Sequence, residues 1–144
     1  MKNANRWFVL FLCLCGIGLS TASLHSHYAA SATDYCDLSQ MFNCDLVNRS
    51  KFSEIFGIPV ALIGLLGYVA LLVISIKKNR VFEILRFWMA LAGFAFALHL
   101  AYIEEHILQT WCLLCIGSLI AIAGITFASG AELWWFGRKD QAAR

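Results

Sequence analysis

Four long apolar runs occupy about half of this 144-residue chain and restrict what it can fold into. They span residues 7–24, 58–76, 87–103 and 112–128. Each approaches the roughly 20 apolar residues that an α-helix needs to cross the hydrocarbon core of a bilayer. Charged residues make up 14% of the sequence, against about 25% in soluble domains. The sequence therefore predicts an all-α membrane protein: a bundle of four transmembrane helices with a long periplasmic loop between the first and the second.

The first run has two interpretations. Lys2 and Arg6 give it a basic start, and small residues follow at 29–32, as in a cleavable signal peptide. Alternatively, it is a retained helix that crosses the bilayer near the minimum length for a span. We favour the retained helix. Both interpretations place the following loop outside the cytoplasm, so the chemistry inferred from that loop does not depend on the choice.

Lysine and arginine are distributed unevenly among the connecting segments. The N-terminus, the turn at 77–86 and the tail at 131–144 are basic, whereas the loop at 25–57 carries a net negative charge. Basic segments stay on the cytoplasmic side of a membrane. We therefore expect one membrane domain over residues 1–130 in a bacterial inner membrane, with both termini in the cytoplasm. The net charge of +2 offers no basic face for nucleic acid.

Four of the six cysteines are predicted to face the periplasm. Cys36 and Cys44 lie in the long loop, and Cys112 and Cys115 form a C-x-x-C motif at the start of the fourth run. That compartment is oxidising in bacteria, and disulfides persist there. A C-x-x-C dithiol can cycle between thiols and disulfide, and a place near the first turn of a helix would favour the reactive thiolate of Cys112. Four cysteines allow three complete pairings.

Static roles for these cysteines fit the chain less well. Half of a zinc site would need further ligands from a protein with little polar sequence. A bundle of spanning helices does not need structural disulfides to fold, and a C-x-x-C disulfide closes too short a loop to stabilise much. Thiol–disulfide exchange between the two pairs is the stronger hypothesis. Cys13 and Cys15, inside the first run, are expected to be small buried hydrophobes.

Electrons that reach the C-x-x-C pair need an acceptor. The sequence has no glycine-rich dinucleotide motif and no P-loop, and Ile116 follows the motif where covalent haem attachment requires His. By elimination, we expect a quinone dissolved in the membrane. The leading hypothesis is a membrane thiol–quinone oxidoreductase that supports disulfide bond formation. The alternative is a structural or metal-binding membrane subunit with static disulfides.

Other polar residues on the outer side are expected to play no part in catalysis. His25 and His27 could bind a metal with nearby aspartates, but solvated side chains at a helix end are the preferred interpretation, and no metal site is predicted. A protonated His106 could lower the pKa of a thiol, although an interfacial or packing role is favoured. Glu104 and Glu105 are expected to be solvated.

The motifs together resemble those of the vitamin K epoxide reductase family in its bacterial form. The resemblance covers roughly residues 7–127. It rests on the loop pair Cys36 and Cys44, on Asn-Cys-Asp-Leu-Val-Asn-Arg-Ser-Lys-Phe-Ser at 43–53, on Phe-Gly-Ile-Pro-Val-Ala-Leu-Ile-Gly-Leu-Leu-Gly-Tyr at 56–68, and on the C-x-x-C motif. In the other bacterial family of quinone-linked disulfide oxidases, the C-x-x-C motif comes first and the loop pair later.

The resemblance implies a role for each of the four cysteines. Cys36 and Cys44 would exchange with a thioredoxin-like partner protein. Cys44 would then pass electrons to Cys112 through an interloop disulfide. Cys115 would be the thiolate beside the quinone.

The resemblance also bears on the surroundings of these cysteines. Ser50 matches a serine that the family uses near the active site, and Ser50 and Ser53 would lie in the quinone vicinity. Leu119 stands where animal members have a tyrosine that contacts the quinone, which favours ubiquinone or menaquinone over vitamin K epoxide as the substrate. Many bacterial members carry a fused thioredoxin-like domain after the fourth helix. Only a short tail follows here, so we expect the partner to be a separate, DsbA-like periplasmic protein.

Overall fold

The computed structural model describes residues 2–29 and 42–142, and most of these residues are helical. The long helices are α1 (Lys2–Tyr28), α3 (Val60–Ile76), α4 (Arg80–Ile103) and α5 (Leu113–Ala142). Between α1 and α3 lie the short helix α2 (Cys44–Asn48), a 3₁₀ turn (Lys51–Ser53), and the strands β1 (Glu54–Ile55) and β2 (Ile58–Pro59). A π-helical turn (Glu104–Leu108) follows α4.

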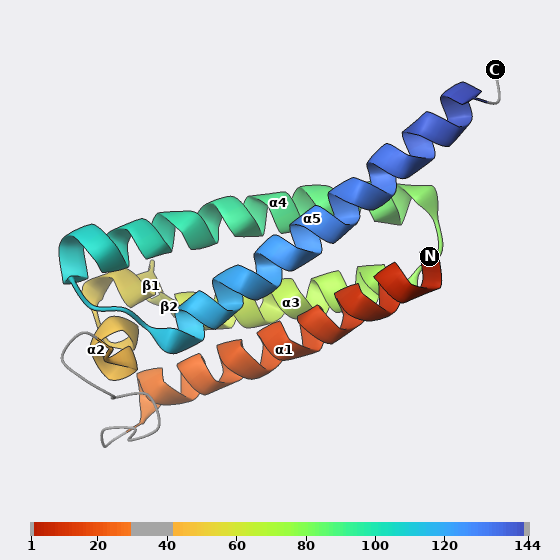
Figure 1. The fold of residues 1–144 in the computed structure, drawn as a ribbon. Coiled ribbons are helices and arrows are strands. Elements are labelled where there is room, and N and C mark those ends of the chain that lie inside the picture. Colours follow the sequence, from red (N-terminus) through yellow and green to blue (C-terminus); the bar gives the residue numbers. More distant parts are fainter. Residues whose placement is uncertain (1, 30–41, 143–144) are drawn as a thin grey trace.

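The long helices pack side by side in one bundle (Figure 1). Both α1 and α4 pack against α3 and α5. The two chain ends lie toward one end of the bundle, and α2, the paired strands β1 and β2, and the turn between α4 and α5 lie toward the other. The segments that carry the predicted redox cysteines and that the structure describes therefore meet at a single end.

Each predicted apolar run falls largely within one long helix, although the helix bounds differ from those of the runs. The second run was predicted to begin at Ile58, whereas Ile58 and Pro59 form β2 and α3 begins at Val60. Pro59 has a ψ of 131°, so it precedes the helix and does not occupy its first turn. The other helices extend beyond their predicted runs, and α4 begins already at Arg80.

Buried serines explain why α1 continues beyond the predicted end of its apolar run. Ser20, Ser23 and Ser26 recur every three residues, and all are buried. This spacing keeps their side chains near one face of the helix. Neighbouring elements of the protein cover that face, so these hydroxyls are kept away from lipid. A segment that looks interrupted in hydropathy therefore remains one continuous helix.

The outer surface of the bundle is apolar. Large side chains including Phe11, Leu66, Val73, Trp88 and Phe127 are exposed there. Within the described residues, the helices long and apolar enough to cross a membrane are three, over Asn3–Tyr28, Arg80–Leu108 and Leu113–Trp135. α3 is apolar throughout but has 17 residues, which is at the lower limit for a span. The chain is a helical membrane protein.

Close helix packing in the core depends on a glycine. A Cβ on Gly16 of α1 would overlap the ring of Tyr68 on α3. That ring is held in place, because the Tyr68 hydroxyl donates a hydrogen bond to the Ser118 carbonyl oxygen of α5 at 2.8 Å. Small residues allow such approach between membrane helices. Cys13, one turn earlier, is a fully buried free thiol of the core, as predicted, and Cys15 is a half-buried free thiol.

Replacing Gly16 with Ala should destabilise the bundle by about 1–3 kcal/mol, the usual cost of overpacking a core. Thermal unfolding of the protein purified in detergent measures the change. Gly18→Ala is the matched control, because a Cβ there meets no atom within 4 Å among the described residues. Equal stability of the two variants would contradict the packing described.

A buried ion pair joins three helices at the end of the bundle that carries the chain termini. Arg86 of α4 is only 4% exposed. It donates hydrogen bonds to Glu132 of α5 at 2.5 Å and to the Ser129 hydroxyl at 3.0 Å. The Asn5 side chain of α1 donates to the same Glu132 oxygen at 3.1 Å. A charge in this position needs its partner, since an unpaired buried ion is strongly destabilising.

Glu132→Gln should therefore lower the free energy of unfolding by about 3 kcal/mol, because it leaves Arg86 buried without a counter-charge. Chemical unfolding in mixed micelles gives this value, with the exposed Glu105→Gln as the control. The double variant Arg86→Met, Glu132→Leu removes both charges and should recover most of the loss. A Glu132→Gln protein as stable as the wild type would show that the pair contributes nothing.

Candidate redox site

The backbone fixes the end of the long loop beside the C-x-x-C motif. Phe42 and Trp111 form a parallel β-bridge, and the Asn43 amide donates a hydrogen bond to the Trp111 carbonyl oxygen at 3.2 Å. The Asn43 side chain also caps α2, since its oxygen accepts a hydrogen bond from a first-turn amide at 2.7 Å. Cys44 begins α2 and Cys112 directly follows Trp111, so both cysteines are positioned from the same bridge.

Three of the four predicted redox cysteines meet in one buried cluster. Cys44 and Cys112 are both fully buried in it, and Cys115 packs against them. Cys44 is disulfide-bonded, whereas Cys112 and Cys115 are free thiols. Cys36 lies outside the described residues. The cluster therefore brings the loop and the C-x-x-C motif, which are far apart in the sequence, into direct contact.

The C-x-x-C motif forms the start of a helix, as predicted. The Ile116 amide donates a hydrogen bond to the Cys112 carbonyl oxygen at 2.9 Å, and the Cys115 amide donates one to the Cys112 sulfur at 3.3 Å. The hydrogen bond with the Cys115 side chain contributes most to lowering the pKa of Cys112, while burial and the charge of Glu104 oppose the shift. Cys112, which precedes the apolar span of α5, thus forms its thiolate more readily than an ordinary cysteine.

Glu104 belongs to the site, and the expectation that it is solvated was wrong. It is 3% exposed, and its carboxylate accepts a hydrogen bond from the Cys112 amide at 3.1 Å. The amides at the start of a helix lack partners within that helix, and the π-helical turn after α4 folds this carboxylate back onto one of them. Glu105 is exposed, as expected.

His106 lies apart from the thiols. Its side chain is 52% exposed, stacks on Tyr102 with ring centroids 4.2 Å apart, and approaches Glu105 at 3.9 Å. These contacts agree with the interfacial or packing role that was favoured from the sequence.

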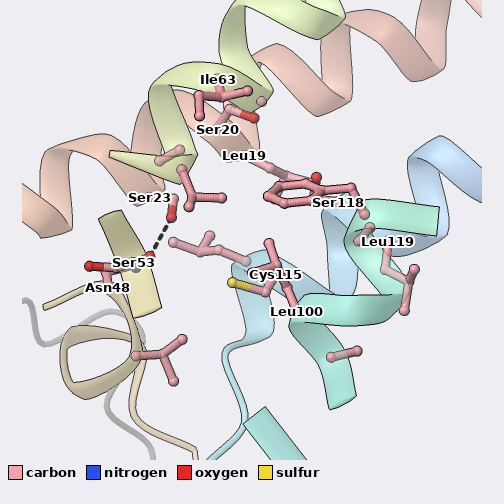
Figure 2. A pocket seen from close by; sticks show the side chains of 18 of the residues that line it. Leu19, Ser20, Ser23, Asn48, Ser53, Ile63, Leu100, Cys115, Ser118 and Leu119 are labelled. Carbon is pink, nitrogen blue, oxygen red and sulfur yellow. Dashed lines mark hydrogen bonds between the residues drawn. The ribbon is translucent and has the colours of Figure 1, made fainter. Parts of the chain in front are cut away.

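A cavity of about 340 Å³ opens beside the thiol pair, between the long helices and the α2 segment. Cys115 lines it, whereas Cys44 and Cys112 do not. Figure 2 shows Cys115 at the cavity with Leu119 and Leu100 on one side and with Asn48 and Ser53 across from it. Its walls are mainly apolar side chains. This volume and lining suit a small, largely apolar ligand that carries few polar groups.

Ser50 and Ser53, both predicted for the quinone vicinity, line this cavity. Their hydroxyls are engaged with the backbone: Ser50 donates to the Val47 carbonyl oxygen at 2.8 Å, and Ser53 donates to the Ser50 carbonyl oxygen at 2.7 Å. Both serines thus hold the turn between α2 and β1 in shape beside the cavity.

Asn48, the last residue of α2, was not singled out from the sequence. It is 6% exposed and lines the cavity. The Ser23 hydroxyl of α1 donates a hydrogen bond to its side-chain oxygen at 2.6 Å (Figure 2). The amide nitrogen of the same side chain is buried and has no hydrogen-bond partner among the described residues.

His27 fastens the α2 segment to the end of α1, so the expectation that it is solvated was wrong. One ring nitrogen contacts the Asn48 carbonyl oxygen at 2.5 Å, and the other lies 3.2 Å from a Glu54 carboxylate oxygen. The side chain is 11% exposed, whereas His25 is exposed as expected. In the part of the chain that the structure describes, no group of three His, Cys, Asp or Glu side chains could hold a metal ion.

Fold and site define a helical membrane protein whose buried cysteine cluster borders an apolar cavity inside the bundle. The sequence profile of the vitamin K epoxide reductase family matches residues 7–129. Vitamin K epoxide reductase complex subunit 1 of Rattus norvegicus is 28% identical over 137 residues, which covers 83% of this chain and 85% of the rat protein. The Mus musculus protein of the same name is 28% identical over 138 residues, with the same coverage. The chain belongs to the vitamin K epoxide reductase family, whose members are oxidoreductases.

The pKa of Cys112 should shift in opposite directions in two variants. Glu104→Gln removes a negative charge that opposes the thiolate, so the first thiol ionisation should occur at lower pH. Cys115→Ala removes the hydrogen bond that does most to favour the thiolate, so Cys112 should ionise at higher pH. The ultraviolet absorbance of the thiolate, followed against pH, reports both shifts in protein whose Cys13 and Cys15 are replaced by Ala.

Glu105→Gln is the control for this titration, because its exposed carboxylate should leave the ionisation unchanged. Shifts of the same sign in Glu104→Gln and Cys115→Ala would rule out the electrostatic arrangement described here.

Proposed function

We propose that this protein is a membrane thiol–quinone oxidoreductase that oxidises a periplasmic thioredoxin-like protein and passes the electrons to a membrane quinone. The observation that carries the proposal is the position of Cys115. It packs against buried Cys44 and Cys112 on one side and lines the apolar cavity on the other. One thiol thus touches both the cysteine cluster and a space that suits a quinone headgroup. A membrane subunit whose disulfides are purely structural would not need such a cavity.

Electrons enter through the loop pair. A thiolate of the partner attacks the Cys36–Cys44 disulfide, and the second partner thiol resolves the mixed disulfide. The partner leaves as a disulfide, and both loop cysteines become thiols. Two electrons have then moved to the loop pair. A separate DsbA-like protein is the partner that this chemistry needs.

The same exchange then moves the electrons inward. The Cys44 thiolate attacks Cys112 of the oxidised C-x-x-C pair, forms a Cys44–Cys112 disulfide and releases the Cys115 thiolate. The Cys36 thiolate next attacks Cys44, which restores the loop disulfide and frees Cys112. The burial of Cys44 and Cys112 in one cluster supports this route. The lowered pKa of Cys112 makes it a good leaving group in the second step.

Ubiquinone or menaquinone is the acceptor that we propose. When bound, the quinone accepts two electrons and two protons from the Cys112–Cys115 dithiol. Cys115 would face its ring, Leu119 and Leu100 would contact it, and Ser50 and Ser53 would fix the loop beside it. Leu119 adds an apolar surface to the cavity and no hydroxyl.

We further propose four membrane spans, in which α3 crosses the membrane together with α1, α4 and α5. The basic termini and the basic turn between α3 and α4 favour the cytoplasm of a bacterium for that end. The cysteine cluster then faces the periplasm. α1 is retained as a helix of the bundle, because its buried face packs against α3 and α5.

Thiol-dependent quinone reduction in detergent tests the proposal. Purified protein receives a soluble quinone analogue and a reduced thioredoxin-like donor, and quinol formation is followed. Cys44→Ser, Cys112→Ala and Cys115→Ser should each reduce the rate to background, because each breaks the sulfur relay. The double variant Cys13→Ala, Cys15→Ala should keep the wild-type rate, since those thiols lie in the helix core. Normal activity of the Cys112→Ala variant would contradict the proposal.

A further inference from the structure

We propose that the Asn48 side-chain amide donates a hydrogen bond to a carbonyl oxygen of the bound quinone and so holds the ring beside Cys115. The inference rests on the proposed function and adds to it the group that recognises the headgroup. The buried Asn48 amide nitrogen has no hydrogen-bond partner in the described part of the chain.

The position of this amide is fixed from two sides. A ring nitrogen of His27 contacts the backbone carbonyl oxygen of Asn48. The side-chain oxygen of Asn48 accepts a hydrogen bond from the Ser23 hydroxyl at 2.6 Å. Both contacts come from α1: the first holds the Asn48 backbone, and the side-chain amide cannot turn without breaking the second. Its nitrogen is therefore held as an unpaired donor on a side chain that lines the cavity. A buried donor without an acceptor is costly, and native proteins rarely leave one unsatisfied.

Several other hydroxyl donors around the cavity are already used within the protein. Ser23 donates to Asn48, while Ser50 and Ser53 donate to backbone carbonyl oxygens. The Tyr68 hydroxyl likewise donates to a carbonyl oxygen. A ligand that needs a donor in this cavity finds a free one at Asn48.

The chemistry that completes the site is a neutral carbonyl oxygen on an otherwise apolar molecule. A quinone ring offers such an oxygen together with a flat apolar body that the leucine-rich wall suits. The ester carbonyl of a membrane lipid offers the same acceptor without the ring. We assign the quinone, because Cys115 lines the same cavity and a thiol there needs a molecule that accepts electrons.

Steady-state kinetics of quinone reduction by the full chain test the assignment. Asn48→Asp keeps the shape of the side chain and loses the donor. It should raise the KM for the quinone analogue about tenfold, as expected for the loss of one hydrogen bond, and leave the KM for the thiol donor unchanged. Leu46→Ala is the control, because Leu46 lies on the same helix and is 49% exposed. An unchanged quinone KM in Asn48→Asp would overturn the assignment and leave the amide as a hydrated group.

Equilibrium dialysis against the protein in detergent, with no thiol donor present, separates this inference from the proposed function. Wild-type protein should bind a naphthoquinone more tightly than a naphthalene of the same substitution, and Asn48→Asp should lose that preference. This readout stands even if the wild type reduces no quinone, which would defeat the proposed function alone. Equal binding of the two ring compounds by the wild type would overturn the inference. Displacement of the naphthoquinone by added phospholipid, in the wild type but not in Asn48→Asp, would assign the donor to a lipid ester instead.

Discussion

The hydrogen bond from the Asn43 amide to the Trp111 carbonyl oxygen joins two segments that are far apart in the sequence. One is the loop that ends in α2, and the other is the turn that leads into α5. Because Cys44 and Cys112 lie one residue beyond these two groups, the β-bridge sets their relative position. The four long helices supply a rigid frame on which the bridge can form. The cap of α2 and the contacts of His27 keep the loop segment from moving away.

Burial then separates two environments within a short stretch of chain. Cys44 and Cys112 lie among protein atoms, where water does not reach them. Cys115, one helical turn further on, borders the cavity. Glu104 lies at the boundary between these two environments, and its carboxylate accepts a hydrogen bond from the Cys112 amide. Sulfur exchange and contact with an apolar ligand can therefore occur on adjacent residues of one helix start without sharing the same space.

The sequence was informative where physical rules are local. Apolar runs predicted the long helices, and the C-x-x-C spacing predicted a dithiol at the start of a helix. The place of Cys36 in this arrangement stays a prediction. Other features depend on tertiary contacts that produce no periodic pattern in the sequence. Glu104 precedes Cys112 by eight positions across a π-helical turn, and nothing distinguishes it in sequence from exposed Glu105. Asn48 and His27 acquire their roles only when α1 lies beside α2, so neither residue could be recognised from its neighbours in the chain.

The buried pair of Arg86 and Glu132 has a consequence for how the protein is assembled. α1 is synthesised first and α5 last, because a chain is made from its N-terminus. Arg86 on α4 is therefore made before its counter-charge on α5, and so is Asn5 on α1, which donates to the same carboxylate. An unpaired buried charge is unfavourable, so the buried position of Arg86 becomes stable only once α5 has packed beside α4. Cys115 lies near the opposite end of the same helix, and Cys112 directly precedes that helix, so the packing of α5 completes both the polar contact and the cysteine cluster.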